Sequence, residues 1–268
     1  MSNIPKILHL YWGGGPMSWL QVQTVVTFHK HNPDWAIQVY TPVRKNEVGI
    51  SYVPEYTGTD WFPVLSTFDY VHMWKVDLQK LGITVALHDI LCSDIFRYSV
   101  LYEQGGVWSD FDVVWIKPIS KLTFVAKPKK EAAAFVCFRR GTEGYHSVGI
   151  LGAKEKHPMY LQLFEACIRR QCRGVEHQTF GSHLFNELFP NFEILQKQYD
   201  DVAGVAYHVF YPYTTIQLRF LYNTTDVGLI KHDTLAVHWF NGHLRSKEFV
   251  NNPRHREIRC SINKLINT

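Results

Sequence analysis

Over the first half of the chain, short apolar runs alternate with segments in which apolar residues recur at helical spacing. Lys6–Trp12 predicts a buried strand, and residues 17–30 place apolar side chains at helical spacing. Asn32 and Pro33 end this helix, because proline lacks an amide donor and restrains the residue before it. Ala36–Tyr40 then predicts a second strand. This order of strand, helix and strand predicts a parallel α/β sheet.

A second unit of this kind follows. Residues 42–63 are rich in Pro, Gly and polar groups and predict an irregular segment, whereas 66–81 fits neither period. His88–Glu103 predicts a helix with one apolar stripe. The glycine pair 105–106 ends that helix, and one continuous strand is predicted from Val107 to Ile116.

The remaining residues predict further elements of both types without a repeat or a linker. The predicted strands cover 132–138, 148–153 and 235–240, and the predicted helices cover 158–172, 181–188 and a polar C-terminal stretch. The economical interpretation is one domain spanning residues 1–268, long enough to bury a large core.

Composition excludes several classes of protein. Nearly half of the residues are hydrophobic, and the net charge of +4 is spread along the chain, so we expect no binding of duplex nucleic acid. No run of apolar residues is long enough to span a membrane, and the N-terminus lacks the features of a signal peptide. The five cysteines form no CxxC pair, which predicts reduced thiols in a cytoplasmic protein.

The acidic pair Asp110 and Asp112 follows an apolar stretch. On an extended segment, residues two apart point to the same side, and two carboxylates repel each other unless a cation or a donor lies between them. Oxygen ligands of this kind suit Mn²⁺ or Mg²⁺ together with diphosphate oxygens. The alternative is that both are polar turn residues that cap a strand.

Asp94 and Arg97 are three residues apart and therefore share one face of the predicted helix. The spacing fits two interpretations. They form a surface ion pair, which contributes little to stability, or they reach a ligand at the carboxyl ends of the strands, where open α/β sheets bind their ligands.

Residues 93–113, SDIFRYSVLYEQGGVWSDFDV, resemble the DXD sugar-binding glycosyltransferases of family 32 and the core of the large clostridial glucosylating toxins. The usual pattern is S-D-x-x-R-x-x-x-L-x-x-x-G-G-x-Y-x-D-x-D. The chain keeps every specified position except one, where Trp108 replaces the tyrosine. Weaker similarities to the family lie at Ile4–Gly14, Asn32–Trp35 and His157–Pro158.

The resemblance implies a GT-A fold, a Rossmann-like domain that binds a nucleotide sugar. It also implies roles for individual residues. Asp112 would be a metal ligand, and Asp110 would contact the donor and support the metal. Asp94 and Arg97 would hold donor-sugar hydroxyls and the diphosphate region, so that these four residues form the catalytic set. Trp12 would stack on the nucleotide base, a contact that suits an indole face; the alternative is a core position.

Many GT-A enzymes take another metal ligand from near the C-terminus. His238, at the end of a short apolar strand, is the corresponding candidate, with a buried structural histidine as the alternative. His243 is the weaker candidate. Arg245 or Lys247 would then meet the diphosphate.

The resemblance also implies the reaction. A sugar would pass from a nucleoside diphosphate sugar, UDP before GDP, to a hydroxyl of a glycan or polysaccharide, with retention of configuration and with Mn²⁺ or Mg²⁺. Residues 1–120 would bind the nucleotide sugar, and 121–268 would form the acceptor side. A bacterial or viral protein in the cytoplasm is expected. Two other interpretations stay open: a metal-dependent phosphohydrolase and a carbohydrate-binding protein without catalysis.

Overall fold

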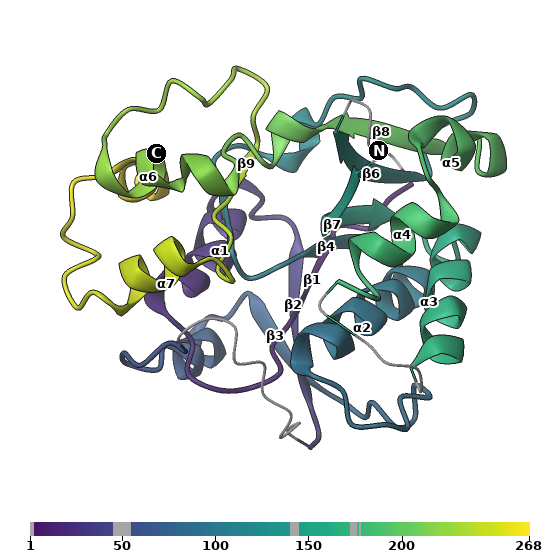
Figure 1. The fold of residues 1–268 in the computed structure, drawn as a ribbon, viewed down its shortest axis with the longest axis horizontal. Helices are drawn as coiled ribbons and strands as arrows, with labels where there is room; N and C mark the ends of the chain where they lie inside the picture. The colour runs from purple at the N-terminus through teal and green to yellow at the C-terminus, as the bar shows by residue number, and fades with distance from the viewer. Residues whose placement is uncertain (1–2, 45–54, 140–144, 172–175, 177) are drawn as a thin grey trace.

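A seven-stranded sheet forms the centre of the structure (Figure 1). The computed structural model describes residues 3–44, 55–139, 145–171, 176 and 178–268. The strands of the large sheet, in spatial order, are β3 (Val71–Val76), β2 (Ala36–Pro42), β1 (Ile7–Tyr11), β4 (Gly106–Ser109), β7 (Tyr145–Ala153), β6 (Ala134–Arg139) and β8 (Val202–Ala206). A second, two-stranded sheet pairs β5 (Val113–Trp115) with β9 (Ala236–His238).

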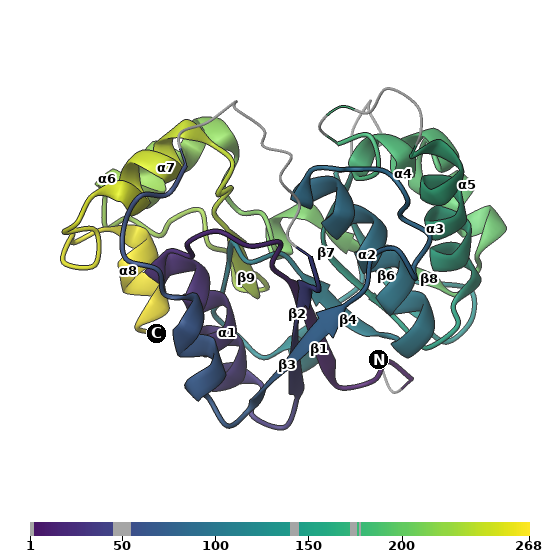
Figure 2. The ribbon, with the colours of Figure 1, turned by 90° about the horizontal axis from the view of Figure 1, so that it is seen from below.

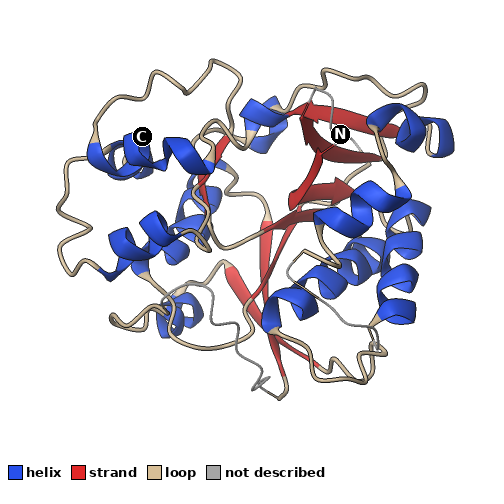
Figure 3. Cartoon of the chain, viewed as in Figure 1, coloured by secondary structure: helices blue, strands red, loops and turns tan. Residues whose placement is uncertain are grey.

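Helices cover both faces of the large sheet, so that the strands run between two helical layers (Figures 2 and 3). One layer contains α2 (Asp89–Gln104), α3 (Pro158–Arg170), α4 (Ser182–Leu188) and α5 (Phe192–Gln198). On the other face α1 (Trp19–His31) packs against the sheet, and α6 (Leu218–Asn223), α7 (Leu244–Asn251) and α8 (Ser261–Ile266) pack around the small β5–β9 sheet beyond it. Short 3-10 turns lie at Phe62–Thr67, Ile119–Lys121, Tyr207–Val209 and Thr215–Gln217. None of the helices in the described part of the chain has the length and apolar character that a bilayer crossing requires.

Strand β1 shows why the sheet is buried on both faces. Leu8 and Leu10 pack into the cluster that contains α1, whereas Tyr11 packs into the cluster that contains α2. Neighbouring residues of a strand point to opposite faces, so an almost uninterrupted apolar run is required where helices cover both sides. The predicted strands of the first half therefore lie at the centre of the fold.

The sheet is mixed rather than parallel, which corrects the expectation from the strand–helix–strand order. Strands β3, β2, β1 and β4 are parallel, but β7 is antiparallel to both β4 and β6. A mixed sheet was not predictable here, because the direction of β7 depends on pairing between segments that are some 40 residues apart.

Strand β3 lies within the segment 66–81 that fitted neither period. It is the edge strand, and His72, Met73, Trp74 and Lys75 are all exposed. An edge strand with no buried face has no reason to alternate apolar and polar residues, which explains the missing pattern. Residues 45–54, within the predicted irregular segment, lie outside the described residues, as does Cys172. The other four cysteines are buried and form no disulfide in the described part of the chain.

The glycine pair closes the turn from α2 into β4 as predicted. Gly105 and Gly106 have φ values of 63° and 91°, a region that favours glycine. The space is also closed: a Cβ on Gly106 would stand 2.6 Å from the carbonyl oxygen of Ile7. The turn thus sets α2 directly beside β1 and β4.

His9 is held in this turn as a neutral, fully buried side chain. Its Nε2 lies 2.8 Å from the Gly105 carbonyl oxygen, and its Nδ1 lies 3.2 Å from the Tyr40 hydroxyl. Burial lowers the pKa of His9 to about 4, although the bond to Gly105 opposes the change. The folded protein therefore resists protonation at a position that the unfolded chain protonates near pH 6.5.

This difference predicts acid sensitivity. The contribution of His9 to stability is complete above pH 6.5 and is lost as the pH falls towards 4, because only the unfolded chain gains a proton in this window. We expect His9 to account for about 3 kcal/mol of loss in the free energy of unfolding between pH 7 and 4, measured by urea denaturation as the difference between the wild type and a His9 variant. The His9→Gln variant should lose distinctly less over the same window, and an unchanged pH dependence would contradict the assignment.

Candidate metal and nucleotide-sugar site

The DXD segment lies in a break between two strands and not within one. The predicted strand Val107–Ile116 divides into β4 and β5, which belong to different sheets, and residues 110–112 connect them. Thr24 of α1 takes the place of a partner strand: its Oγ1–H donates to the Phe111 carbonyl oxygen (2.8 Å), and the Val113 N–H donates to Oγ1 (3.3 Å). The break is therefore hydrogen-bonded by the helix that passes beneath it.

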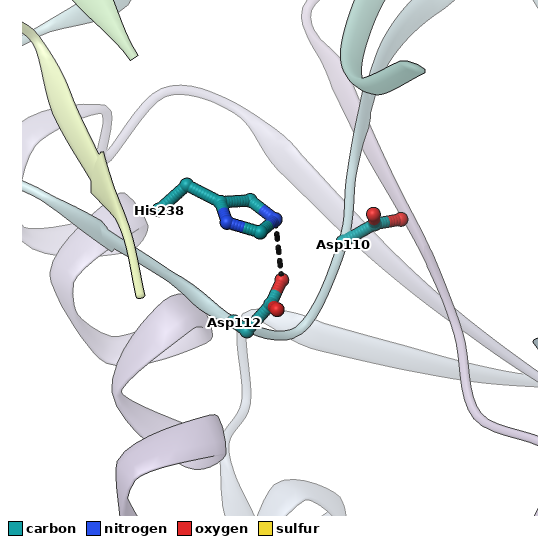
Figure 4. Close-up of side chains that lie close together, drawn as sticks. All are labelled: Asp110, Asp112 and His238. Carbon is teal, nitrogen blue, oxygen red and sulfur yellow. Dashed lines mark ion pairs between the residues drawn. The ribbon is translucent and has the colours of Figure 1, made fainter. Parts of the chain in front are cut away.

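Pairing of β5 with β9 brings His238 to Asp112. The register sets Val113 opposite His238, and the Trp239 N–H donates to the Asp112 carbonyl oxygen (2.8 Å). The side chains then meet, with His238 Nε2 3.0 Å from Asp112 Oδ1 (Figure 4). The backbone N–H of Asn241 donates to the other oxygen, Oδ2, at 2.7 Å.

Asp110 points away from this pair (Figure 4) and towards α2. Its Oδ1 accepts a hydrogen bond from Trp108 Nε1–H at 2.9 Å and lies 3.3 Å from Arg97 Nη2. The Trp108 side chain, which stands where the family usually has tyrosine, therefore still supplies a hydrogen-bond donor to the acidic segment.

Arg97 and Asp94 are buried, so the interpretation as a surface ion pair is wrong. Both side chains are 4% exposed, and Arg97 Nη2 lies 2.7 Å from Asp94 Oδ1. Arg97 Nη1 also donates to the Val148 carbonyl oxygen (2.5 Å), and the guanidinium lies 5.1 Å from the ring centroid of Trp108. Held on all these sides, Arg97 links Asp94 of α2 to Asp110 at the end of β4.

The cluster carries more negative than positive charge. Its three carboxylates, Asp94, Asp110 and Asp112, are balanced by Arg97 alone when His238 is neutral, which leaves an excess of two negative charges, and a protonated His238 reduces this excess to one. A divalent cation is the charge that would neutralise this excess.

The pKa values report the same imbalance. Burial raises the pKa of Asp94 to about 6, against the opposing effect of Arg97. Burial raises the pKa of Asp110 too. Burial alone would raise the pKa of Asp112 and lower that of His238, but their mutual attraction outweighs it, so Asp112 lies below and His238 above its ordinary pKa. The ion pair therefore stabilises the charged form of both groups.

The three groups lie close enough together to be candidate ligands of one cation. One ligand atom each from Asp110, Asp112 and His238 lies within 4.8 Å of the others. His238 Nε2 and Asp112 Oδ1 are in direct contact at 3.0 Å, about the separation of neighbouring ligand atoms in an octahedral site with bonds of roughly 2.1 Å. Imidazole and carboxylate together suit Mn²⁺.

One contact opposes ligation in the present arrangement. The Phe240 N–H donates to His238 Nδ1 (3.2 Å), so the proton of a neutral ring stands on Nε2, towards Asp112. A cation can bind at Nε2 only if this proton leaves Nε2. If the proton moves to Nδ1, the hydrogen bond from the Phe240 N–H to Nδ1 is lost. Phe240 has a φ of 53°, a strained value for this residue type, in the turn that would have to adjust.

Trp12 lies beside the same segment. Its ring meets the ring of Phe111, the middle residue of the DXD motif, edge-on at 5.7 Å and is stacked with Phe62 at 6.5 Å. Its Nε1–H donates to the Gly15 carbonyl oxygen (3.1 Å). The indole is half-buried, so it is neither a core residue nor a free surface platform.

The two basic candidates from the C-terminal segment differ in position. Arg245 is exposed, and its backbone N–H donates to His243 Nδ1, which caps α7. Lys247 is half-buried, and burial lowers its pKa, against the opposing effect of Asp112. Lys247 is thus the basic group of this segment that interacts with the acidic cluster.

Some contributors to the site were missed at the level of sequence. Thr24 and Thr27 stand three apart on α1, and both support the broken strand, since the Trp115 N–H donates to Thr27 Oγ1 (3.0 Å). Two threonines at helical spacing in an apolar helix were the available signal. Gly149 of β7, whose carbonyl oxygen accepts from the Asp110 N–H (2.9 Å), gave no signal.

Comparisons with known proteins point to glycosyltransferases. Residues 20–127 match the model of the family described as "Glycosyltransferase sugar-binding region containing DXD motif". Inositol phosphoceramide mannosyltransferase 1 of Schizosaccharomyces pombe is 28% identical over 133 residues, which cover 47% of this chain and 34% of that protein. Human alpha-1,4-N-acetylglucosaminyltransferase is 20% identical over 229 residues, 78% of this chain and 63% of the relative. The chain thus spans about a third of the first relative's length and under two thirds of the second's.

The fold agrees as well. The structure of the PaToxG glycosyltransferase superposes with a TM-score of 0.51 at 18% identity, covering 73% of this chain and 74% of that one. The predicted GT-A fold is therefore confirmed.

The cluster predicts a dissociable Mn²⁺ site. We expect the wild-type protein to bind Mn²⁺, measured by the electron paramagnetic resonance signal of the free ion, and Asp112→Asn to weaken binding at least tenfold, because a ligand is lost. Asp233→Asn is the matched control, since Asp233 also pairs with a histidine (His208, 2.9 Å) away from the acidic cluster. Equal affinity in the Asp112→Asn and wild-type proteins would refute the site.

Proposed function

We propose that the chain is a glycosyltransferase of the family that carries a DXD sugar-binding region, and that it moves a sugar from a nucleoside diphosphate sugar to a hydroxyl of a glycan or polysaccharide. The proposed donor is a UDP-sugar, with a GDP-sugar second, and the proposed cation is Mn²⁺ or Mg²⁺. One observation carries the proposal: Asp110, Asp112 and His238, from segments 126 residues apart, converge beside the buried Arg97–Asp94 pair.

When bound, the divalent ion would act as a Lewis acid on the diphosphate leaving group. Asp112, His238 and Asp110 would hold it. Lys247 interacts electrostatically with Asp112, and its ammonium would meet the phosphate oxygens, with the exposed Arg245 on the same helix. Both would stabilise the negative charge that develops on the diphosphate as the bond between sugar and diphosphate breaks.

Asp94 and Arg97 would orient the donor sugar. Their conformations are fixed before any ligand arrives, because Arg97 is bonded to Asp94, Asp110 and the Val148 carbonyl oxygen. A prearranged polar group avoids the cost of reorganisation in the transition state. Trp12, next to Phe111, is the proposed contact of the nucleotide base.

Retention of configuration is part of the proposal. Each carboxylate of the cluster is already committed: Asp94 and Asp110 to Arg97, and Asp112 to His238 and the Asn241 amide. A carboxylate held in this way is a poor nucleophile, which favours transfer on one face of the sugar, assisted by the leaving group, without a covalent intermediate on the protein.

The acceptor side is proposed to lie in residues 121–268, and residues 1–120 to hold most of the donor site. The two relatives are named for transfer of different sugars, mannose and N-acetylglucosamine, so a panel of donors is needed. A cytoplasmic location is also proposed, in keeping with the buried, reduced thiols of Cys92, Cys137, Cys167 and Cys260.

A panel of UDP- and GDP-sugars with Mn²⁺ tests the reaction. We expect one donor to raise the thermal unfolding midpoint only with the cation, and the same donor to be consumed with a sugar acceptor. Asp112→Asn should lower turnover by at least a hundredfold, and Asp233→Asn should leave it unchanged. Release of phosphate without transfer would favour the phosphohydrolase, and sugar binding that needs neither cation nor nucleotide would favour a binding protein.

The basic residues of α7 give a separate prediction. Lys247→Ala should weaken binding of UDP with Mn²⁺ about tenfold, and Arg245→Ala should weaken it less, because only Lys247 is half-buried beside the cluster. Isothermal titration with UDP measures both constants. A larger effect of Arg245→Ala would reverse the assigned order of the two contacts.

A further inference from the structure

Tyr211 packs against a proposed ligand of the cation. It follows the 3-10 turn Tyr207–Val209 and is 3% exposed. Its ring centroid lies 4.9 Å from that of His238, with 35° between the planes, and the ring of Tyr207 is stacked with it at 4.8 Å. The imidazole thus rests on an aromatic ring that is itself fixed by a second one.

Gly149 sets the hydroxyl of Tyr211 close to Asp110. A Cβ on Gly149 would stand 2.8 Å from Tyr211 Oη, 3.0 Å from Asp110 Oδ2 and 3.4 Å from His238 Cδ2. All three side chains therefore converge on one small volume above β7, which is open only because residue 149 has no side chain. Residue 149 is therefore restricted to glycine by the available space, because the side chain of any other residue would collide with the cluster.

The two oxygens of Asp110 have different surroundings. Oδ1 is committed to Trp108 and Arg97, whereas Oδ2 faces the volume beside Gly149 and Tyr211. Oδ2 is thus the oxygen left for a cation. A hydrogen-bond donor on that side would fix the orientation of the Asp110 carboxylate. Tyr211 Oη is buried and makes no hydrogen bond within the described residues, so its O–H is available to a carboxylate oxygen.

We propose that Tyr211 is a positioning residue of the cation site. Its hydroxyl directs Asp110 Oδ2, its ring holds the imidazole of His238, and Gly149 provides the space in which they meet. The inference rests on the proposed function, because it assumes that this cluster binds a divalent cation. Tyr211 acts through Asp110 and His238 and does not contact the reacting atoms.

Mn²⁺ binding to the full chain tests the role of the hydroxyl. Tyr211→Phe keeps the ring against His238 and removes only the oxygen, so we expect the dissociation constant for Mn²⁺ alone to rise about tenfold. Tyr213→Phe is the matched control: Tyr213 is also fully buried and lies two residues along the chain, but it packs in the cluster around Leu218 and Trp239. This variant should bind Mn²⁺ like the wild type.

Gly149→Ala adds a second, independent test. The added methyl would collide with Tyr211 Oη and Asp110 Oδ2, so Mn²⁺ affinity should again fall at least tenfold. Because the methyl and the hydroxyl compete for the same space, the double variant Gly149→Ala, Tyr211→Phe should be no weaker than Gly149→Ala alone. Thermal unfolding midpoints compare the stability of all variants with that of Tyr213→Phe.

The outcomes separate this inference from the proposed function. If the wild type binds no Mn²⁺, the proposed function fails and the inference fails with it. If the wild type binds and Asp112→Asn does not, but Tyr211→Phe keeps the wild-type affinity, only the inference is overturned. Fully additive losses in the double variant would also overturn it, since they would show that the two groups do not share one volume.

Discussion

The excess of negative charge at the end of β4 governs the local structure around it. Two of the three carboxylates, Asp94 and Asp110, pair with Arg97, and the third, Asp112, is held by His238 and the Asn241 N–H, which the β5–β9 pair brings to it. Buried carboxylates without such donors would be protonated or would open the site to water. The remaining imbalance is what makes the cluster suitable for a divalent cation.

The break in the strand is what permits this arrangement. Had the chain continued as one strand from Val107 to Ile116, it would have stayed in the large sheet, and β9 would have had no partner there. By leaving the sheet at residue 110, it meets α1 on one side and β9 on the other, and Thr24 and Thr27 satisfy the backbone groups that the break exposes. The site is therefore built on rigid elements and not on a free loop, which suits a constellation that must be held in place.

Some residues of the site lie outside the part of the chain that matches the family. The matched region, residues 20–127, includes Asp94, Arg97, Asp110 and Asp112. His238 lies beyond it and completes the three-residue cluster in space, and the ring of Tyr211 packs against His238. The matched region thus contains four of the proposed site residues, and the later part of this chain supplies the histidine.

Much of the fold follows from the sequence. Apolar runs and helical spacing predicted β1, α1, β2, α2 and most later elements, because these residues are buried and their periods are local properties. The motif with its glycine pair indicated the family and the acidic residues. Three features were decided by the tertiary structure: the mixed sheet, the strand break at residues 110–112, and the meeting of His238 with Asp112 across 126 residues. Each depends on which distant segments pair, and a strand carries no local record of its partner.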